Sequence, residues 1–270
     1  MKISVITPAF NSANVIRKNV LSIISQNYSN FEHIIIDKRS SDSTLQIVTD
    51  LYRGAGLENK LKIFSGEDTG ISDAFNKGIN AASGNIITIL NSDDSYIGDA
   101  VFDTVVNLFR RNPKSLIVHG DIFFKDEKYG SNVRNPLPYH AIEGVLFNHP
   151  TMFLKREVYT EIGLFDTDFK YSMDFELYCR LAKKYKPLKN YCCYYQNEPL
   201  VLMEAGGASW KNEFGSIAEL KKALIKNGLW GFDSSKFYYA RLFRTKVKEF
   251  LTSIKMDKII TKWRNLKWKK

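Results

Sequence analysis

Short runs of apolar, mostly β-branched residues alternate with amphipathic stretches along the first 125 residues. The apolar runs predict buried strands over residues 3–6, 33–36, 61–64, 86–90 and 116–118. The stretches between them repeat apolar side chains every three to four positions, which predicts helices over residues 14–26, 43–52, 72–82 and 100–111. Strands and helices alternating at this spacing predict an α/β fold, with a mostly parallel, Rossmann-like sheet covered by helices on both faces.

The pattern changes after residue 125. Helical periodicity returns over residues 157–163, 174–184 and 212–227, and the aromatic segment 191–203 is typical of mixed strands. A glycine-rich stretch over residues 205–209 predicts a loop. No internal repeat or linker divides the chain before the C-terminal region, so we expect one body followed by a helical extension.

The C-terminal residues 236–270 combine apolar stripes with a basic face. Of the 39 basic and 29 acidic residues in the chain, twelve and two lie in this tail, which leaves 27 of each sign in the first 235 residues. The formal net charge of +10 therefore belongs to the tail. Spacings of three and four place the apolar side chains on helical stripes: Phe243, Val247, Phe250, Leu251 and Ile254, then Met256, Ile259, Ile260, Trp263 and Leu266.

The composition excludes several classes of protein. With 44% apolar and 25% charged residues, the chain is typical of a globular protein with a buried core. No apolar run is long enough to span a membrane, and the N-terminus lacks the pattern of a signal peptide. Three cysteines, two of them adjacent, do not form a disulfide framework. We therefore expect a cytoplasmic protein.

Polar side chains follow four of the predicted strands, at the point where each strand ends. Because the carboxyl ends of parallel strands meet at one edge of a sheet, these residues should converge there, where α/β proteins bind ligands. The residues in question are Thr7, Pro8, Ala9 and Asn11 after the first strand, Asp37 after the second, Asp68 and Asp73 after the third, and Asn91, Ser92, Asp93 and Asp94 after the fourth.

Glycine-rich phosphate-binding loops are absent from this edge. The turn after the first strand has no glycine, and no G-x-x-x-x-G-K-[ST] sequence occurs. A bound nucleoside diphosphate would then need another neutralising group, for which a cation held by carboxylates is the obvious substitute. The segment 91–94, with its acidic pair Asp93 and Asp94 at a strand end, offers the oxygen ligands that Mg²⁺ or Mn²⁺ prefers. A solvated turn with Asp94 capping the next helix is the alternative.

These segments resemble the inverting family 2 glycosyltransferases with a GT-A-type fold, in the branch that builds bacterial exopolysaccharide and O-antigen. The similar segments include residues 4–11, Asp37 with residues 40–44, residues 66–78, and residues 89–94 at the position of the D-x-D metal motif. The resemblance continues through residues 148–153, 163–166, 173–177 and 206–209, and covers roughly residues 2–215. Asn91 stands where many members have the first Asp of D-x-D, so metal binding should depend on Asp93.

The resemblance implies a division of labour along the chain. A catalytic domain would span residues 1–215, with residues 1–125 binding the nucleotide sugar and residues 126–215 binding the acceptor, and residues 216–270 would form the helical extension with its basic amphipathic tail. The converging strand-end residues named above would bind the donor, Asp93 would hold Mn²⁺ or Mg²⁺, and Asp174 would be the catalytic base. His149, Gly206, Gly207, Glu176 and Asp94 are candidates for contacts with the diphosphate or the acceptor.

The implied reaction transfers a sugar, preferably from a UDP-sugar, to a hydroxyl of a glycan or lipid-linked acceptor in cell-surface polysaccharide synthesis. A carboxylate base would deprotonate the hydroxyl as it attacks, and a single displacement inverts the anomeric centre. Several simpler interpretations stay open. Asp174 could only cap a helix, His149 could only make structural hydrogen bonds, and Gly206 and Gly207 could only form a turn.

The tail and the overall activity also have alternatives. Its pattern is typical of a helix lying on an anionic membrane surface, which would place the enzyme at the inner face of the plasma membrane. Packing against protein is the alternative, and a nucleic-acid partner is disfavoured because the rest of the chain is neutral. Other interpretations of the whole chain are a different nucleotide-diphosphate enzyme, such as a nucleotidyltransferase, or a non-catalytic sugar-nucleotide-binding scaffold.

Overall fold

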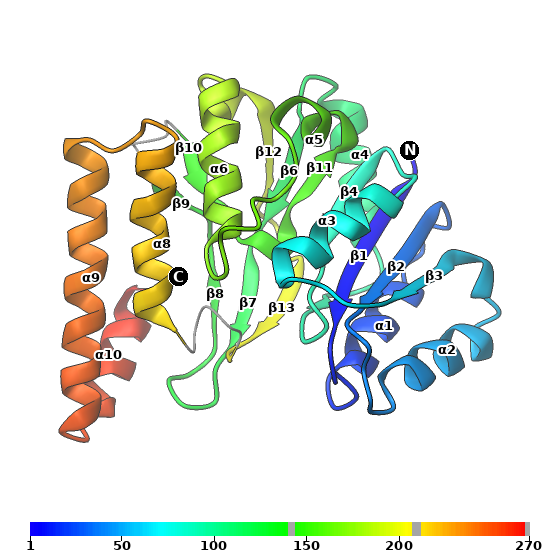
Figure 1. Ribbon diagram of the computed structural model, residues 1–270, viewed down its shortest axis with the longest axis horizontal. Helices are drawn as coiled ribbons and strands as arrows, with labels where there is room; N and C mark the ends of the chain where they lie inside the picture. Colours follow the sequence, from blue (N-terminus) through cyan, green and yellow to red (C-terminus); the bar gives the residue numbers. More distant parts are fainter. Residues whose placement is uncertain (140–143, 207–211, 268–270) are drawn as a thin grey trace.

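The computed structural model describes residues 1–139, 144–206 and 212–267. The fold is built around a seven-stranded sheet in the order β12-β6-β11-β4-β1-β2-β3 (Figure 1). Its strands are β1 (Ile3–Ala9), β2 (Phe31–Asp37), β3 (Leu61–Ser65), β4 (Ile86–Ile89), β6 (Ile117–Gly120), β11 (Phe153–Lys155) and β12 (Cys192–Tyr195). All neighbouring strands are parallel except β11, which runs antiparallel between β4 and β6. The predicted α/β class is confirmed.

A smaller sheet lies beside the carboxyl end of the large one. Its order is β5-β13-β7-β8, made by β5 (Ser95–Tyr96), β7 (Ile122–Lys125), β8 (Asn132–Arg134) and β13 (Val201–Glu204). A two-stranded ribbon joins β9 (Leu137–Tyr139) to β10 (Gly144–Leu146). The predicted mixed strands of segment 191–203 are thus β12 and β13, which belong to different sheets.

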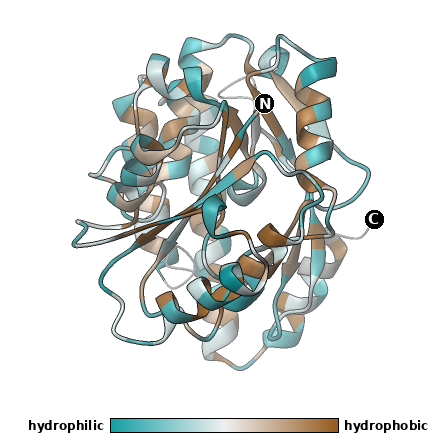
Figure 2. Cartoon of the chain, turned by 90° about the vertical axis from the view of Figure 1, so that its right-hand side faces the viewer, coloured by the Kyte–Doolittle hydropathy of each residue, from teal (hydrophilic) through white to brown (hydrophobic). Residues whose placement is uncertain are grey.

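Alternate residues of β1 pack on opposite faces of the large sheet. Ile3 and Val5 of β1 pack toward α4 (Val101–Arg111), Ala9 packs toward α1 (Ile16–Ile24) and α2 (Thr44–Gly54), and Ile6 packs on the other face. Figure 2 shows the apolar strands running through the centre of the molecule, between helices that are polar on their outer sides. The helices of the other face are α3 (Ile71–Ala81), α5 (Arg156–Ile162), α6 (Met173–Lys184) and α8 (Glu213–Lys226).

The body of the fold extends past the boundary predicted after residue 215. That boundary falls inside α8, whose Leu220, Ala223 and Leu224 lie in the same core as Ile6 and Phe75. The large sheet likewise takes strands from both sides of residue 125. The division at residue 125 is therefore not a structural one, and it stays a prediction about which segments bind donor and acceptor.

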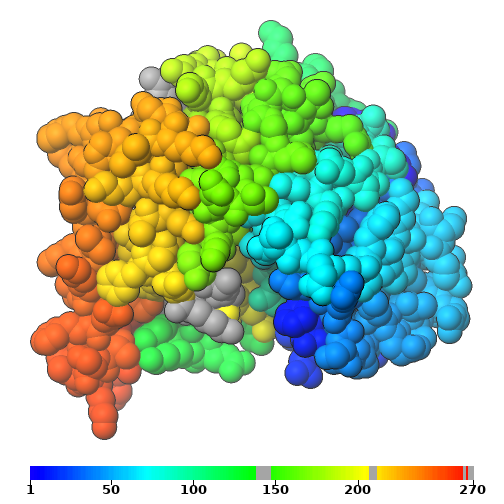
Figure 3. Space-filling model, in the orientation of Figure 1, coloured from blue at the N-terminus to red at the C-terminus, as the bar shows by residue number. Residues whose placement is uncertain are grey.

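Two helices beyond α8 form one flank of the molecule, drawn from orange to red in Figure 3. They are α9 (Phe232–Ser253) and α10 (Asp257–Lys267). Helix α10 is fixed to the turn between β7 and β8, since Tyr129 Oη donates to Asp257 Oδ1 at 3.0 Å and Lys128 Nζ lies 3.2 Å from the same oxygen. None of the helices within the described residues has the length and apolar character needed to cross a bilayer.

Candidate functional site

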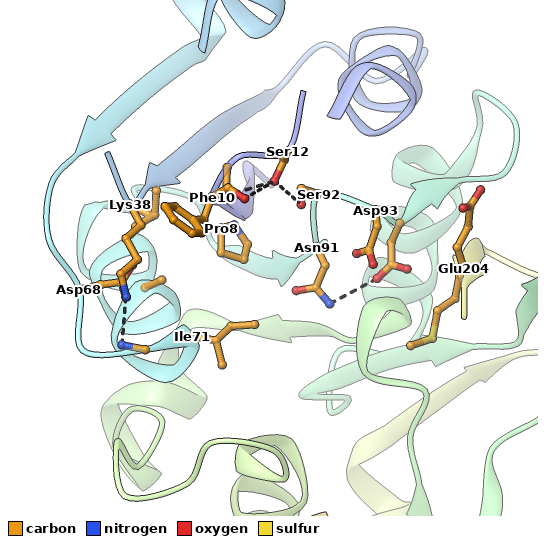
Figure 4. A pocket seen from close by; sticks show the side chains of 16 residues that line it. Pro8, Phe10, Ser12, Lys38, Asp68, Ile71, Asn91, Ser92, Asp93 and Glu204 are labelled. Carbon is orange, nitrogen blue, oxygen red and sulfur yellow. Dashed lines mark hydrogen bonds and ion pairs between the residues drawn. The ribbon is translucent and has the colours of Figure 1, made fainter. Parts of the chain in front are cut away.

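A cavity of about 340 Å³ lies at the carboxyl edge of the large sheet. The loops that follow β1, β2 and β4 border it, together with the start of α3 and the end of β13. Figure 4 shows Asn91 and Asp93 in the middle of this site, with Phe10 and Lys38 on one side and Glu204 on the other. Of the predicted donor-binding residues, the cavity is lined by Pro8, Ala9, Asp68, Asn91, Ser92 and Asp93, and Asp94 lines it as well.

The segment after β4 folds into a tight turn that presents oxygen atoms to the cavity. Asp94 N donates to Asn91 O at 3.0 Å, and Asn91 Nδ2 donates to Asp94 Oδ2 at 3.4 Å. The other amide atom, Asn91 Oδ1, is buried and has no hydrogen-bond partner among the described residues. Asp94 is only 1% exposed, and burial together with the neighbouring Asp93 raises the pKa of its carboxyl well above the usual range.

The residues of this turn fit a hard divalent cation. Asp93 supplies a carboxylate and Asn91 supplies an amide oxygen without a partner among the described residues, and both residues line the cavity. Oxygen donors of this kind suit Mg²⁺ or Mn²⁺, which take few protein ligands and complete their coordination with substrate phosphates and water. Across the described part of the chain, no three His, Cys, Asp or Glu side chains gather as a metal cluster. Asn91 and Asp93 are therefore the candidate ligands.

The opposite wall carries a cation of the protein itself. Lys38 Nζ lies 3.0 Å from Asp68 Oδ1, and Gly70 N donates to the same oxygen at 2.9 Å. Asp73 does not reach the cavity, because it pairs with Lys77 at 3.0 Å and accepts a hydrogen bond from Thr69 N. Its predicted donor contact is not supported by this position.

Phe10 is a site residue that the sequence interpretation missed. Its ring is 58% exposed and lines the cavity next to Ser12. The Ser12 hydroxyl lies 3.1 Å from that of Ser92, which joins the loop after β1 to the turn after β4. A large aromatic side chain in the polar segment that follows the first strand was the available signal.

Three predicted donor-binding residues contact other parts of the protein and do not line this cavity. Thr7 is fully buried and hydrogen-bonds His33. Asn11 adopts the left-handed conformation, with φ at 45°, and its Oδ1 accepts from Ser41 N. Asp37 is 1% exposed and accepts from Ser40 N at 3.1 Å and from the Ser65 hydroxyl at 2.6 Å. None of the three lines the main cavity, and they brace the loops that do.

Asp174 is the second residue of α6 and lies close to His149. Phe175 N donates to Asp174 Oδ1 at 2.8 Å, so the carboxylate is oriented by the helix N-terminus. The ring of His149 stacks on Phe75 with centroids 5.6 Å apart. Burial lowers the pKa of His149, while the Asp174 carboxylate acts in the opposite direction. The structure thus brings these two predicted residues together, outside the lining of the main cavity.

Glu176 has a structural role instead of the predicted ligand contact. Its buried carboxylate receives both Nε and Nη2 of Arg180 at 2.8–3.0 Å and a hydrogen bond from Asn227 Nδ2 at 3.3 Å. These contacts use both oxygens and join α6 to α8. We therefore remove Glu176 from the candidate site.

The glycine loop is described only in part. Gly206, with φ at 127°, borders a second polar hollow together with Lys125, Lys128 and Glu204. Since Glu204 also lines the main cavity, the two hollows are neighbours. Gly207 lies outside the described residues.

Comparison with known proteins agrees with this architecture. The chain is 27% identical over 226 residues to an uncharacterized glycosyltransferase of Rickettsia typhi, covering 78% of this chain and 66% of the relative. Staphylococcus aureus TarS 1–349 in complex with UDP-GlcNAc superposes with a TM-score of 0.63 at 17% identity, over 84% of this chain and 65% of TarS. The mannosyltransferase PcManGT from Pyrobaculum calidifontis, in complex with GDP-Man and Mn²⁺, gives 0.59 at 15% identity, over 100% and 88% of the two chains.

The chain thus spans slightly less than two thirds of the length of the Rickettsia relative and of TarS. The structural matches confirm the predicted GT-A-type fold with its C-terminal helices. The sequence profile described as "Glycosyl transferase family 2" matches residues 4–175, so the chain belongs to glycosyl transferase family 2.

Proposed function

We propose that the chain transfers a sugar from a UDP-sugar to a hydroxyl of a glycan or lipid-linked acceptor, with inversion at the anomeric carbon. The observation that carries the proposal is the cavity at the carboxyl edge of the sheet, where Asn91 and Asp93 face Lys38 and Phe10. TarS, whose fold is similar, is described with UDP-GlcNAc bound. The similarity to TarS is one of fold, and PcManGT, which has a similar fold, is in complex with GDP-Man. UDP as the nucleotide of the donor is therefore part of our proposal.

The cavity walls suit the two ends of a nucleoside diphosphate. The exposed Phe10 ring offers a flat apolar face to the base, a contact worth about 1–3 kcal/mol in other nucleotide-binding proteins. Lys38 places a positive charge within the same cavity. Asn91 and Asp93 would hold Mn²⁺ or Mg²⁺, and such an ion, when bound, supplies positive charge against the leaving diphosphate.

Asp174 would be the general base for the acceptor hydroxyl. A base must be ionised, and a carboxylate in the first turn of α6 is favoured in that form by the helix dipole. His149 lies beside it, and burial lowers the pKa of this ring while the Asp174 carboxylate acts in the opposite direction. The hydroxyl proton passes to Asp174 as the oxygen attacks.

Donor binding tests the cavity assignment. Titration calorimetry should show that UDP binds in the presence of Mn²⁺ and that EDTA weakens this binding at least tenfold. Asp93→Asn should have the same effect as EDTA, because it removes the charged ligand of the ion. Asp103→Asn, in α4 and outside the cavity lining, is the matched control and should bind UDP normally. Binding of UDP that is indifferent to both EDTA and Asp93→Asn would refute the assignment.

The base is tested by separating turnover from binding. Asp174→Asn should lower the rate of UDP-sugar turnover by about 10²–10⁴-fold and leave the UDP dissociation constant within twofold. Glu176→Gln should destabilise the fold but keep the turnover of the folded protein, since this carboxylate is used by Arg180. If Asp174→Asn keeps its turnover, the base lies elsewhere.

We also propose that α9 and α10 attach the enzyme to an anionic membrane surface. The five predicted stripe residues 243, 247, 250, 251 and 254 lie in α9 and at the residue that follows it. Phe243 and Phe250 of this stripe are 68% and 63% exposed. Ile260 of the second stripe is buried, so this side chain packs against the protein and does not face a membrane. The other stripe residues are all at least partly exposed: Val247, Leu251 and Ile254 in the first set, and Met256, Ile259, Trp263 and Leu266 in the second. The excess of lysine and arginine in residues 236–270 complements anionic lipid headgroups.

Vesicle flotation tests this attachment with the full chain. The protein should float with vesicles that contain phosphatidylglycerol, and it should stay behind with phosphatidylcholine alone or at high salt. Phe243→Ser combined with Phe250→Ser should abolish flotation. Phe64→Ser, an exposed apolar residue of β3, should not. If the double variant still floats, the two rings are not part of the membrane contact. If the full chain does not float and the double variant changes only the oligomeric mass in solution, this face binds protein instead.

A further inference from the structure

Four fully buried polar side chains form a continuous chain of hydrogen bonds behind the cavity. Tyr52 Oη of α2 lies 2.8 Å from His33 Nδ1, and His33 Nε2 lies 2.9 Å from Thr7 Oγ1. Thr7 Oγ1 donates to Asn19 Oδ1 of α1 at 3.5 Å. Each of the four residues has an exposed fraction of 0%. The chain crosses β2 and β1 and ends at α1.

Asn19 continues this chain to the turn that holds the candidate metal ligands. Its Nδ2 donates to Asn91 O at 2.8 Å and to Asp94 O at 3.1 Å. These two carbonyls are the first and last of the turn, which Asp94 N closes by donating to Asn91 O. One side chain therefore ties both ends of the turn to α1, while Asn91 and Asp93 face the cavity on the other side.

The orientation of the Asn19 side-chain amide determines which group donates and which accepts in each of these hydrogen bonds. Reversing the Asn19 amide would place its oxygen against two carbonyl oxygens, so Nδ2 must be the donor and Oδ1 the acceptor. The Thr7 hydroxyl then donates its only hydrogen to Asn19 Oδ1 and accepts a hydrogen bond from His33 Nε2–H. His33 carries its proton on Nε2, and its Nδ1 accepts from the Tyr52 hydroxyl.

The ionisation states agree with this direction. Burial lowers the pKa of His33 to about 3 and raises the pKa of Tyr52, so both side chains are neutral at physiological pH. In this arrangement each donor faces one acceptor, and none of these buried polar groups is left unpaired, which would be destabilising.

We propose that Asn19 is a positioning residue for the metal-binding turn, oriented by Thr7, His33 and Tyr52. This inference rests on the proposed function, because it assigns the turn a role in holding a cation and a diphosphate. Asn19 does not line the cavity, so it acts through the carbonyls of Asn91 and Asp94. Its removal should free the turn and misplace the Asn91 and Asp93 oxygens without touching the ligand.

The test compares two substitutions at adjacent buried positions of α1. Asn19→Ala removes both hydrogen bonds to the turn, and Val20→Ala removes a fully buried apolar side chain without polar contacts. Both should lower the free energy of unfolding. Only Asn19→Ala should weaken UDP binding in Mn²⁺, by about 10–100-fold, which is typical of residues that support metal ligands. Equal losses of affinity in the two variants would overturn the proposal.

A second measurement keeps the proposal testable without any ligand. In the ligand-free protein, Asn19→Ala should speed hydrogen exchange of the Asp94 amide more than Val20→Ala does, because the turn loses its support. Exchange that is the same in both variants would contradict the proposal. If wild-type protein fails to bind UDP with Mn²⁺, the proposed function fails, while the exchange comparison still decides the role of Asn19.

The tautomer of His33 is a third measurement and needs no substitution. Long-range proton–nitrogen correlation spectra of wild-type protein should show a neutral ring protonated on Nε2. Protonation on Nδ1 would reverse the chain at Thr7 and remove the argument that Thr7, His33 and Tyr52 orient Asn19. This readout remains available even if Asn19→Ala does not fold.

Discussion

The strand-end region and the C-terminal helices depart from the usual distribution of side chains in opposite directions. Behind the cavity, the fold buries Thr7, Asn19 and His33, which are polar. Along α9, it exposes Phe243 and Phe250, which are apolar. The buried polar groups are hydrogen-bonded to one another, whereas the two phenylalanines are 68% and 63% exposed. The hydrogen-bonding groups behind the cavity are satisfied within the protein. The exposed apolar side chains of α9 are suited to contact with a surface outside the chain.

This comparison predicts that the buried region is sensitive to the loss of single atoms. Thr7→Val keeps the shape of the side chain but leaves His33 Nε2 and Asn19 Oδ1 unpaired, so it should lower the free energy of unfolding by about 3 kcal/mol. Thr7→Ser keeps the hydroxyl and should lose less than half as much. Urea unfolding monitored by circular dichroism measures both. A Thr7→Val protein as stable as Thr7→Ser would mean that the chain contributes little.

Acidification should weaken the same region. The folded pKa of His33 is about 3 and the unfolded value is about 6.5, so the unfolded state binds more protons between these values. Stability should fall as the pH drops below 6.5 and level off below 3. Between pH 7 and 5, wild-type protein should lose about 2 kcal/mol more than His33→Phe. His119, whose pKa is lowered to about 4, contributes equally in both proteins and cancels.

The exposed region should tolerate changes that the buried one does not. Phe243→Ser combined with Phe250→Ser should change the free energy of unfolding by less than about 0.5 kcal/mol, because neither ring is buried. Urea unfolding without vesicles is the measurement. A loss of several kcal/mol would show that these rings pack on the protein in solution, and the contrast between the two regions would disappear.

Much of the first half of the fold was predictable from sequence, because strands and helices differ in hydrophobic period. Residues 86–90 and 100–111 correspond to β4 and α4 within one or two positions. The insertion of β11 between β4 and β6 was not predictable. It is a three-residue strand, Phe153–Lys155, whose place depends on pairing with distant segments.

The site was predictable at the level of loops and less so at the level of side chains. Asn91, Ser92 and Asp93 line the cavity as expected, since a parallel strand delivers the residues that follow it to the sheet edge. Thr7 was misplaced because β1 continues to Ala9, past the predicted end at residue 6, so Thr7 is buried within the strand and the cavity lining begins at Pro8. For Glu176, the pairing with Arg180 four residues on was visible in the sequence, but its burial against Asn227, which follows α8, was not.

The antiparallel strand β11 has a consequence for biosynthesis. It supplies the hydrogen bonds that join β4 to β6, and it lies more than sixty residues after β4 in the chain. While a ribosome has released only the earlier segments, β4 keeps one unpaired backbone edge, which is a template for wrong pairing. The nascent protein is therefore most vulnerable to aggregation until Lys155 has emerged, and truncations that end before it should be recovered as insoluble material.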